Sequence, residues 1–378
     1  MRKLAGAILC ALVLLTGCKT SPRRTTEELP VPPEHVPESV TVETNKPSRE
    51  RIPPFTPAPP EEPPPEPTPA PANPATPLAP KPPPQPEAKW QSLNRWAEGN
   101  GFGALRRVTS GPVESFALIA NTGVLTLNIG SLSARWENLE VRLGFAPQLT
   151  DGQVFVNALD LHKNIEPLLR PLRLPPADGR VVVIDAGHGG SNTGTRSVAG
   201  GFEKEFTLDW ALRLASLLET NGWNVLLTRT NDVDVSLNDR VEFTAAHKAD
   251  LFISLHFNSP GSGSSDAAGL ETYCLTPAGM TSSLTRGYDD NLSQAFPNNA
   301  FDEQNLAYAV RLHAAVLKVN GNLDRAVRRA RFLTVLRGQN QPAVLIEGGY
   351  LSNAREARKI ANPDYRQKLA EAVAEALK

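Results

Sequence analysis

The pattern of hydrophobic and polar positions predicts several buried strands in the C-terminal part of the chain. Three apolar runs, Arg180–Asp185, Asp250–His256 and Pro342–Gly349, are rich in Val, Ile, Leu or Phe and lack polar alternation. Continuous apolar runs of this length are typical of strands that are covered on both faces of a sheet. Each run contains a polar residue at or near its end, the first run is followed by Ala186-Gly187, and the third ends in Gly348-Gly349.

Segments with helical spacing separate these runs. A helix is predicted to begin at Glu203, and two more are predicted over residues 237–246 and 304–319. The apolar positions of the first helix recur at helical spacing at Leu208, Ala211, Leu212, Ala215 and Leu218. Strands that alternate with helices favour an α/β domain over residues 180–378, with a mainly parallel central sheet flanked by helices.

Residues 90–174 show a different pattern, which predicts a small α+β domain. A short helix is expected over Ser92–Glu98, followed by a hairpin around Asn121-Thr122-Gly123. The predicted strands are Ser115–Ala120, Val124–Ile129, Val141–Phe145 and Gln153–Val156. No cluster of catalytic residue types is visible in this segment, and His162 is interpreted as a structural residue.

Residues 18–89 form a segment that cannot build a core. Of the 35 prolines in the chain, 24 lie between Pro22 and Pro86, and large apolar residues are scarce there. Such a composition cannot bury enough apolar surface to offset the entropy of ordering. We expect a disordered, Pro-rich linker.

The first residues have the features of an export signal. Arg2 and Lys3 precede an apolar run, Leu4–Leu15, that is too short to span a bilayer as a helix. Residues 1–17 therefore predict a signal peptide. Its end, Leu15-Thr16-Gly17-Cys18, resembles the bacterial lipobox, which implies lipidation of Cys18 and attachment to a membrane. Because Lys19 follows, the resemblance favours the outer membrane, facing the periplasm, if the cell is Gram-negative.

Charge and cysteine content narrow the possible partners. The net charge of −1 provides no global field that would recruit nucleic acid, so we expect no nucleic-acid partner. Of the three cysteines, Cys10 lies in the predicted signal peptide and Cys18 is the predicted lipid anchor. Cys274 is then left without a partner, and no intramolecular disulfide is expected.

The ends of the three apolar runs carry the candidate chemistry. The first run leads to His188, the second ends in His256 and the third contains Glu347 before two glycines. A parallel sheet would bring these ends to one rim. Two histidines and one carboxylate form a three-ligand zinc site with an open fourth position, and a further carboxylate can act as a base. Taken singly, the His188 turn could be only a tight loop, and Glu203 could be only a partner of the helix dipole.

The same residues carry a family resemblance. Residues 180–378 resemble the zinc-dependent N-acetylmuramoyl-L-alanine amidases of the amidase-3 type. The matching pieces, in the order of the family, are Ile184–Gly190, Glu203-Lys204, Thr228-Arg229-Thr230, Ser254–Ser259 and Val344–Asn353. The resemblance implies that His188, Glu203 and His256 bind Zn²⁺ and that Glu347 is the catalytic glutamate. It also implies that the substrate is peptidoglycan, cleaved between N-acetylmuramic acid and L-alanine of the stem peptide. Asp185 would either support the site from behind the ligands or cap the strand end.

Some positions depart from the pattern of the family. Ser191–Gly194 stands where an Asp-Pro pair is common, and Phe257 replaces a frequent small residue, so we expect altered substrate fit. The segment Pro260–Asn305 is long, and its part from Thr281 to Ala300 is interpreted as a lid or a specificity loop. The basic stretch Asp324–Arg331 is expected to face solvent, followed by a strand over Phe332–Leu336.

Two alternatives remain open at this point. The chain could be a peptidoglycan-binding protein without turnover, or a zinc peptidase that cuts within the stem peptide. Residues 141–161 of the small domain are similar to the copper amine oxidase N-terminal-like domain found on bacterial wall proteins, which implies a binding or spacing module.

Overall fold

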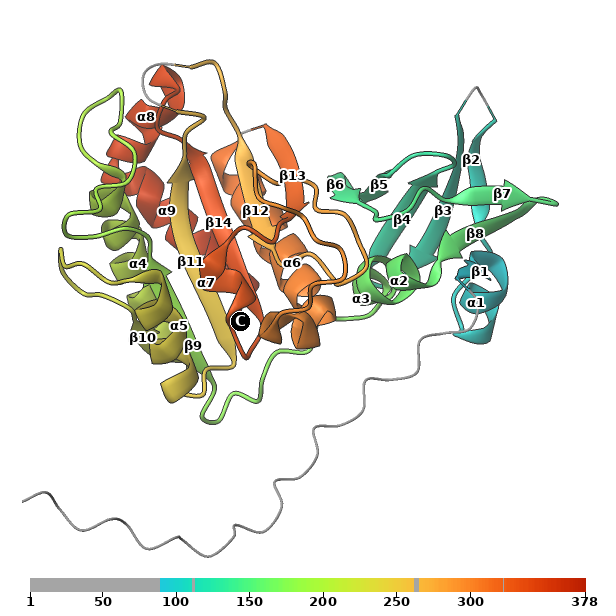
Figure 1. Ribbon diagram of the computed structural model, residues 1–378, viewed down its shortest axis with the longest axis horizontal. Coiled ribbons are helices and arrows are strands. Elements are labelled where there is room, and N and C mark those ends of the chain that lie inside the picture. The colour runs from blue at the N-terminus through green and yellow to red at the C-terminus, as the bar shows by residue number, and fades with distance from the viewer. Residues whose placement is uncertain (1–88, 111–112, 262–264, 322) are drawn as a thin grey trace, which may run out of the picture. The chain divides into compact units, whose positions relative to one another are not determined.

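The computed structural model describes residues 89–110, 113–261, 265–321 and 323–378 (Figure 1). The predicted signal peptide, Cys18 and the predicted linker as far as residue 88 lie outside the described residues. All described residues belong to one compact unit. Among the helices of these residues, none combines the length and the apolar character that a membrane crossing requires.

The C-terminal segment is an α/β structure whose parallel strands are those expected from the apolar runs. Strands β10 (Asn224–Leu227), β9 (Val181–Ala186), β11 (Leu251–Asn258) and β14 (Ala343–Tyr350) are neighbours in this order, and all pair in parallel. Strand β12 (Leu270–Cys274) runs antiparallel to β14 and parallel to β13 (Asp324–Arg329). Within this segment the strand pairs are therefore mainly parallel. The pair of β12 with β14 is antiparallel, and β12 and β13 both run opposite to the other four strands.

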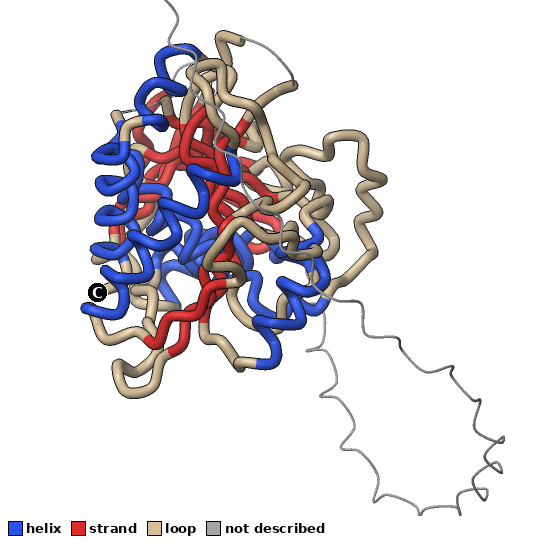
Figure 2. The backbone as a smooth tube through the Cα atoms, turned by 90° about the vertical axis from the view of Figure 1, so that its left-hand side faces the viewer, coloured by secondary structure: helices blue, strands red, loops and turns tan. Residues whose placement is uncertain are grey.

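Helices cover both faces of this sheet. On one face, helices α4 (Glu203–Thr220) and α6 (Asp302–Asn320) pack on the strands, and α9 (Pro363–Ala376) packs against both of these helices (Figures 1 and 2). Helices α5 (Leu237–Ala246) and α7 (Thr334–Arg337) lie in contact with each other, and α7 also contacts β14. The short helix α8 (Ala354–Ala361) joins β14 to α9.

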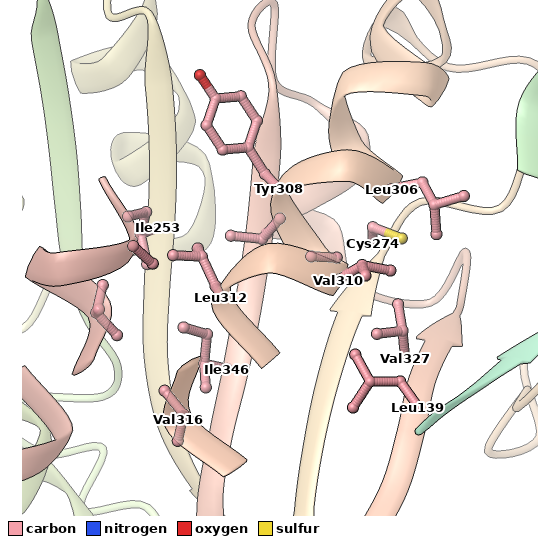
Figure 3. Packing of buried hydrophobic residues seen from close by; sticks show 14 of the residues in the cluster. Leu139, Ile253, Cys274, Leu306, Tyr308, Val310, Leu312, Val316, Val327 and Ile346 are labelled. Carbon is pink, nitrogen blue, oxygen red and sulfur yellow. The ribbon is translucent and has the colours of Figure 1, made fainter. Parts of the chain in front are cut away.

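The alternation of side chains along the strands divides the apolar core in two. Val182 and Ile184 of β9 belong to the cluster under α4, α6 and α9, whereas Val183 belongs to a smaller cluster with Phe252 and Leu336. Figure 3 shows residues of α6 directed at the sheet, with Leu312 and Val316 beside Ile346. Because successive residues of a strand point to opposite faces, a continuous apolar run can fill both clusters.

Residues 90–174 build two further groups of strands. Strands β2 (Arg106–Ser110), β3 (Glu114–Ala120), β4 (Gly123–Asn128), β5 (Ser133–Trp136) and β6 (Leu139–Arg142) form an antiparallel series. Strands β1 (Trp90–Ser92), β8 (Gln153–Asn157) and β7 (Gln148–Thr150) form a second sheet, accompanied by α1 (Leu93–Gly99). Three short turns of helix follow, α2 (Ala158–Asp160), a π-helical turn (Leu161–Ile165) and α3 (Glu166–Leu169).

One strand pair joins the two segments. Val141 of β6 pairs with Val327 of β13, which extends the central sheet to eleven strands. The predicted helix and hairpin of the small segment are confirmed within one or two residues. Its predicted strand Val141–Phe145 is found earlier, at Leu139–Arg142, because the turn at Gly144 and Phe145 is held by Asp160, whose carboxylate accepts both backbone N–H groups at 2.8 Å.

Two expectations for the region before β14 are wrong. Arg329 and Arg331 do not face solvent but are 4% and 0% exposed. Both Nη groups of Arg331 find partners inside the protein: Nη2 donates to the carbonyl groups of Pro277 and Met280 at 2.7 Å each, and Nη1 pairs with Asp290. The apolar residues after it form no strand. Residues 334–337 form the single turn α7, which buries Val335 and Leu336 against the smaller cluster.

Phe257, for which altered substrate fit is expected, also has a packing role. Its side chain is 1% exposed, and its ring centroid lies 5.3 Å from that of Trp210 on α4. The space for it is left by Gly348, where a Cβ atom would approach the Phe257 ring to 3.0 Å and the Trp210 ring to 2.9 Å. Phe257 therefore fills the core beneath α4.

We expect Phe257→Ala to lower the free energy of unfolding by about 3–5 kcal/mol, the usual cost of removing a buried phenylalanine. Equilibrium unfolding in urea measures this loss. Leu212→Ala, which changes a residue of α4 that is 44% exposed, is the control and should cost far less. Equal losses in the two variants would contradict the packing role of Phe257.

Candidate metal centre and active site

The carboxyl ends of three parallel strands place the candidate residues in one cleft. His256 of β11 pairs in register with Glu347 of β14, and Leu255 pairs with Ala186 at the end of β9. His188 follows β9 directly, and Glu203 is the first residue of α4. A cleft of about 630 Å³ is lined by all four of these residues.

The carboxylate of Glu203 lies between the two imidazoles. Its Oε1 is 3.0 Å from His188 Nε2 and 3.0 Å from His256 Nδ1. The same oxygen accepts the backbone N–H of Phe257 at 3.1 Å, and Oε2 accepts that of Thr195 at 3.0 Å. Glu203 is only 3% exposed, so these contacts replace the water that a carboxylate otherwise needs.

Electrostatics within this trio favour a cation. Burial alone would raise the pKa of Glu203, but the two imidazoles outweigh burial and lower it. Burial would lower the pKa of His188, yet the Glu203 carboxylate raises it. Two ring nitrogens are thus aimed at one ionised oxygen. This is a donor set that a divalent cation fits, since it can replace the shared protons.

The turn that carries His188 is strained, and two buried arginines hold its backbone in place. His188 has a φ of 63°, in the left-handed region that residues with a side chain rarely adopt. Arg240 donates to the carbonyl groups of His188 at 2.7 Å and Ala186 at 2.9 Å. Arg229 donates to the carbonyl groups of Ala186 and Gly187, each at 2.9 Å. Both guanidinium groups are buried, and together they fix the backbone of the turn.

The orientation of the imidazoles is fixed as well. His188 Nδ1 lies 2.9 Å from Oδ1 of Asn192, which leaves Nε2 to face Glu203. Gly187 lies against the second ring, because a Cβ atom at this position would come within 2.3 Å of His256. Asn192 belongs to the stretch that departs from the pattern of the family, and it contacts His188, a candidate metal ligand.

Asp185 occupies the position behind the site. It is 1% exposed, pairs with Arg240, and accepts hydroxyl donors from Thr228 and Ser254 at 2.7 Å each. Burial would raise the pKa of Asp185, but Arg240 and the two hydroxyls outweigh it and hold the pKa below its ordinary value. Of the two roles left open for Asp185, its contacts favour support of the site, since it holds the arginine that clamps the His188 turn.

Glu347 faces the same cleft in a different electrostatic setting. Its Oε2 is buried and has no hydrogen-bond partner among the described residues. Burial and the nearby carboxylate of Glu203 raise the pKa of Glu347 well above its ordinary value of 4.5. A carboxyl group with a raised pKa can take up a proton at neutral pH and return it, as a general acid–base group must.

Several functional residues were not assigned a role from the sequence. Arg240 lies within a predicted helix and Arg229 within a motif that matches the family, and neither position indicates which groups the side chain contacts. Asn192 could have been singled out as a polar residue four positions after His188 in a glycine-rich turn. The buried Glu271 on β12, in register with Glu347, gave no signal, because a glutamate within a short strand is not distinctive.

An α/β domain that brings two imidazoles and a carboxylate from its strand ends together with a second carboxylate from the start of α4 defines a candidate metal-dependent hydrolase. The amidase-3 family model, described as N-acetylmuramoyl-L-alanine amidase, matches residues 182–378, which are more than half of the chain. The chain therefore belongs to this family.

Individual relatives cover the same segment. The N-acetylmuramoyl-L-alanine amidase AmiA of Escherichia coli is 32% identical over 217 residues, covering 52% of this chain and 74% of AmiA. The uncharacterised protein YqiI of Bacillus subtilis is 31% identical over 199 residues, covering 52% of this chain and 83% of YqiI. Among solved structures, the catalytic domain of the amidase CwlV from Bacillus (Paenibacillus) polymyxa var. colistinus is 33% identical. That match covers 52% of this chain and 96% of the solved catalytic domain, with a TM-score of 0.43.

The setting of Glu347 predicts a stability effect. Because its pKa is raised, the folded protein binds this proton more tightly than the unfolded chain does. The resulting stabilisation is full at low pH and is lost as the pH rises through the raised pKa. Glu347→Gln cannot ionise, so in metal-chelating buffer it should melt at a higher temperature than the wild type at neutral pH.

The gain should amount to about 2–4 °C for each kcal/mol. It should shrink as the pH falls and vanish below 4.5, the ordinary pKa of glutamate. Thermal melts between acidic and neutral pH measure this difference, with the exposed Glu98→Gln as the control. A Glu347→Gln variant that melts at or below the wild-type temperature at neutral pH would show that the carboxylate is not destabilised.

Proposed function

We propose that this chain hydrolyses the amide bond between N-acetylmuramic acid and L-alanine of peptidoglycan, with zinc held by His188, Glu203 and His256 and with Glu347 as the general base. Membership of the family supports the reaction and its wall substrate. The observation that carries the assignment of residues is the approach of two imidazole nitrogens to one buried carboxylate oxygen, at 3.0 Å each, in the cleft that also holds Glu347.

The donor set selects the kind of metal. Two imidazoles and one carboxylate suit zinc, and three protein ligands leave a fourth position free for catalysis. Bound there, zinc would act as a Lewis acid that polarises the amide carbonyl and makes water more acidic. Asn192 and Arg240 hold His188 in the orientation that such a site requires.

Glu347 would move the proton during the reaction. Its carboxylate accepts a proton from water as the water oxygen forms a bond to the amide carbon. The bond between carbon and nitrogen then breaks, and Glu347 returns the proton to the nitrogen, because an amine leaves readily only when it is protonated. The products are a free lactyl carboxylate on the sugar and a peptide with a free L-alanine amino group.

We further propose that the protein is an exported lipoprotein of the cell envelope. This rests on the Leu15-Thr16-Gly17-Cys18 motif after a short apolar run, which supports lipidation of Cys18. Lys19 after the cysteine supports an outer-membrane location, facing the periplasm, in a Gram-negative cell. Such an anchor would place the enzyme beside its polymeric substrate.

Digestion of purified sacculi by the zinc-loaded protein tests the reaction. We expect soluble peptides whose mass and amino terminus identify free L-alanine. Peptides released with another amino terminus would instead identify a peptidase that cuts within the stem. If the folded, zinc-loaded protein releases nothing, it is a wall-binding protein without turnover, and the proposed reaction is wrong.

Two substitutions separate metal binding from proton transfer. His188→Ala removes a ligand and should abolish stoichiometric zinc binding, measured by elemental analysis after dialysis. Glu347→Gln should retain zinc yet lose about 100-fold or more of the hydrolysis rate, the usual contribution of a general base.

His247→Ala is the matched control, because this histidine lies at the end of α5, where its ring contacts the carbonyl group of Phe243 outside the cleft. It should keep both zinc and activity. Near-normal turnover by Glu347→Gln would rule out its role as the base.

A further inference from the structure

The cleft contains a cationic side chain that the proposed mechanism does not use. Two arginines, Arg240 and Arg286, are among the residues that line it. Arg240 is buried and paired with Asp185. Arg286 is exposed, and no carboxylate of the described residues lies within ion-pair distance of it. An unpaired guanidinium in a substrate cleft is available to an anionic group of the ligand.

The segment that presents Arg286 is anchored to the body of the domain. It follows β12, and buried Arg331 binds it at three points, the carbonyl groups of Pro277 and Met280 and the carboxylate of Asp290. Farther along the chain, Asp290 also accepts the backbone N–H and the hydroxyl of Ser282, at 2.8 and 2.7 Å. The position of Arg286 is therefore set by buried polar contacts on both sides of it.

The side chain of Arg286 is also oriented. Nη2 donates to Oδ1 of Asn258 at 3.4 Å, and the guanidinium lies over the ring of Phe332, 5.4 Å from its centroid. Asn258 cannot turn its amide freely, because its Nδ2 donates to buried Glu271 at 2.7 Å. The oxygen of Asn258 thus faces Arg286 and accepts from one N–H of its guanidinium group. The remaining N–H donors of this planar group are left for a ligand.

Arg286 lies in the same cleft as the reacting groups. His256 and Glu347 also line this cleft, and Asn258, the partner of Arg286, is two residues beyond His256 on β11. A ligand group bound by Arg286 would therefore lie in the cleft that receives the scissile amide. The cleft volume of about 630 Å³ can accommodate the sugar substituent and the first residues of a peptide.

We propose that Arg286 binds the free carboxylate of the stem residue that follows L-alanine, and so makes the enzyme prefer isoglutamate over isoglutamine at that position. The inference rests on the amidase function and specifies its substrate. An Arg–carboxylate pair can form two parallel hydrogen bonds, whereas a neutral amide offers one acceptor and no charge. Amidation of that residue would remove the recognised group without changing its size.

The test compares two soluble substrates that differ only in this group, N-acetylmuramoyl-L-alanyl-isoglutamate and its isoglutamine counterpart with a common peptide extension. The ratio of their kcat/KM values is measured for the zinc-loaded wild type and for Arg286→Ala. We expect the wild type to prefer the carboxylate. In Arg286→Ala this preference should fall by about 10- to 100-fold, the range for a lost charged hydrogen bond.

Two further variants separate the effect of the charge of Arg286 from that of its planar shape and test whether the effect is specific to the cleft. Arg286→Lys keeps the charge but loses the planar fork, so it should retain more of the preference than Arg286→Ala does. Arg355→Ala removes an exposed arginine outside the cleft and should keep the wild-type ratio. Because the readout is a ratio within one protein, a general loss of folded enzyme does not change it.

The contradicting results are distinct. A wild-type ratio near one, or an unchanged ratio in Arg286→Ala, would overturn the role of Arg286 while leaving the amidase reaction intact. Cleavage of neither substrate at the bond before L-alanine would instead count against the proposed function itself.

Discussion

The structure of the active centre depends on one buried charge. Glu203 is 3% exposed, and its carboxylate is ionised because two imidazoles and two backbone N–H groups surround it. An ionised group without such compensation would cost several kcal/mol to bury. The compensation exists only when β9, β11 and the first turn of α4 are all in place. The fold and the ligand set are therefore coupled, and the strain at His188 is held by the same buried arginines that support this arrangement.

Glu203 and Glu347 lie in one cleft, but their surroundings shift their pKa values in opposite directions. Glu203 is bound by donors and has a lowered pKa, whereas Glu347 has a raised pKa and an oxygen that finds no partner in the part of the chain that the structure describes. The first arrangement suits a metal ligand and the second suits a group that exchanges protons. This difference is the physical basis for assigning the two glutamates different roles.

The sequence predicted the parallel strands, the main helices and the meeting of His188, His256 and Glu347, because apolar runs and strand ends leave a local pattern. It did not predict the support of the site. Arg240 and Arg229 act through carbonyl groups distant along the chain, and no local spacing reports such contacts. The burial of the basic stretch before β14 was not predicted for the same reason, since Arg331 donates to carbonyl groups of a loop about fifty residues earlier. The resemblance of the small domain to a copper amine oxidase N-terminal-like domain and the lipid anchor remain predictions.

The central claim is that His188, His256 and Glu203 hold one zinc ion at the rim of the sheet. Crystals of the zinc-loaded protein, measured on both sides of the zinc absorption edge, test it most directly. We expect a single strong anomalous peak within bonding distance, about 2.0–2.2 Å, of both imidazoles and the Glu203 carboxylate. A peak bound to other residues, or no peak at this site in protein that hydrolyses peptidoglycan, would contradict it.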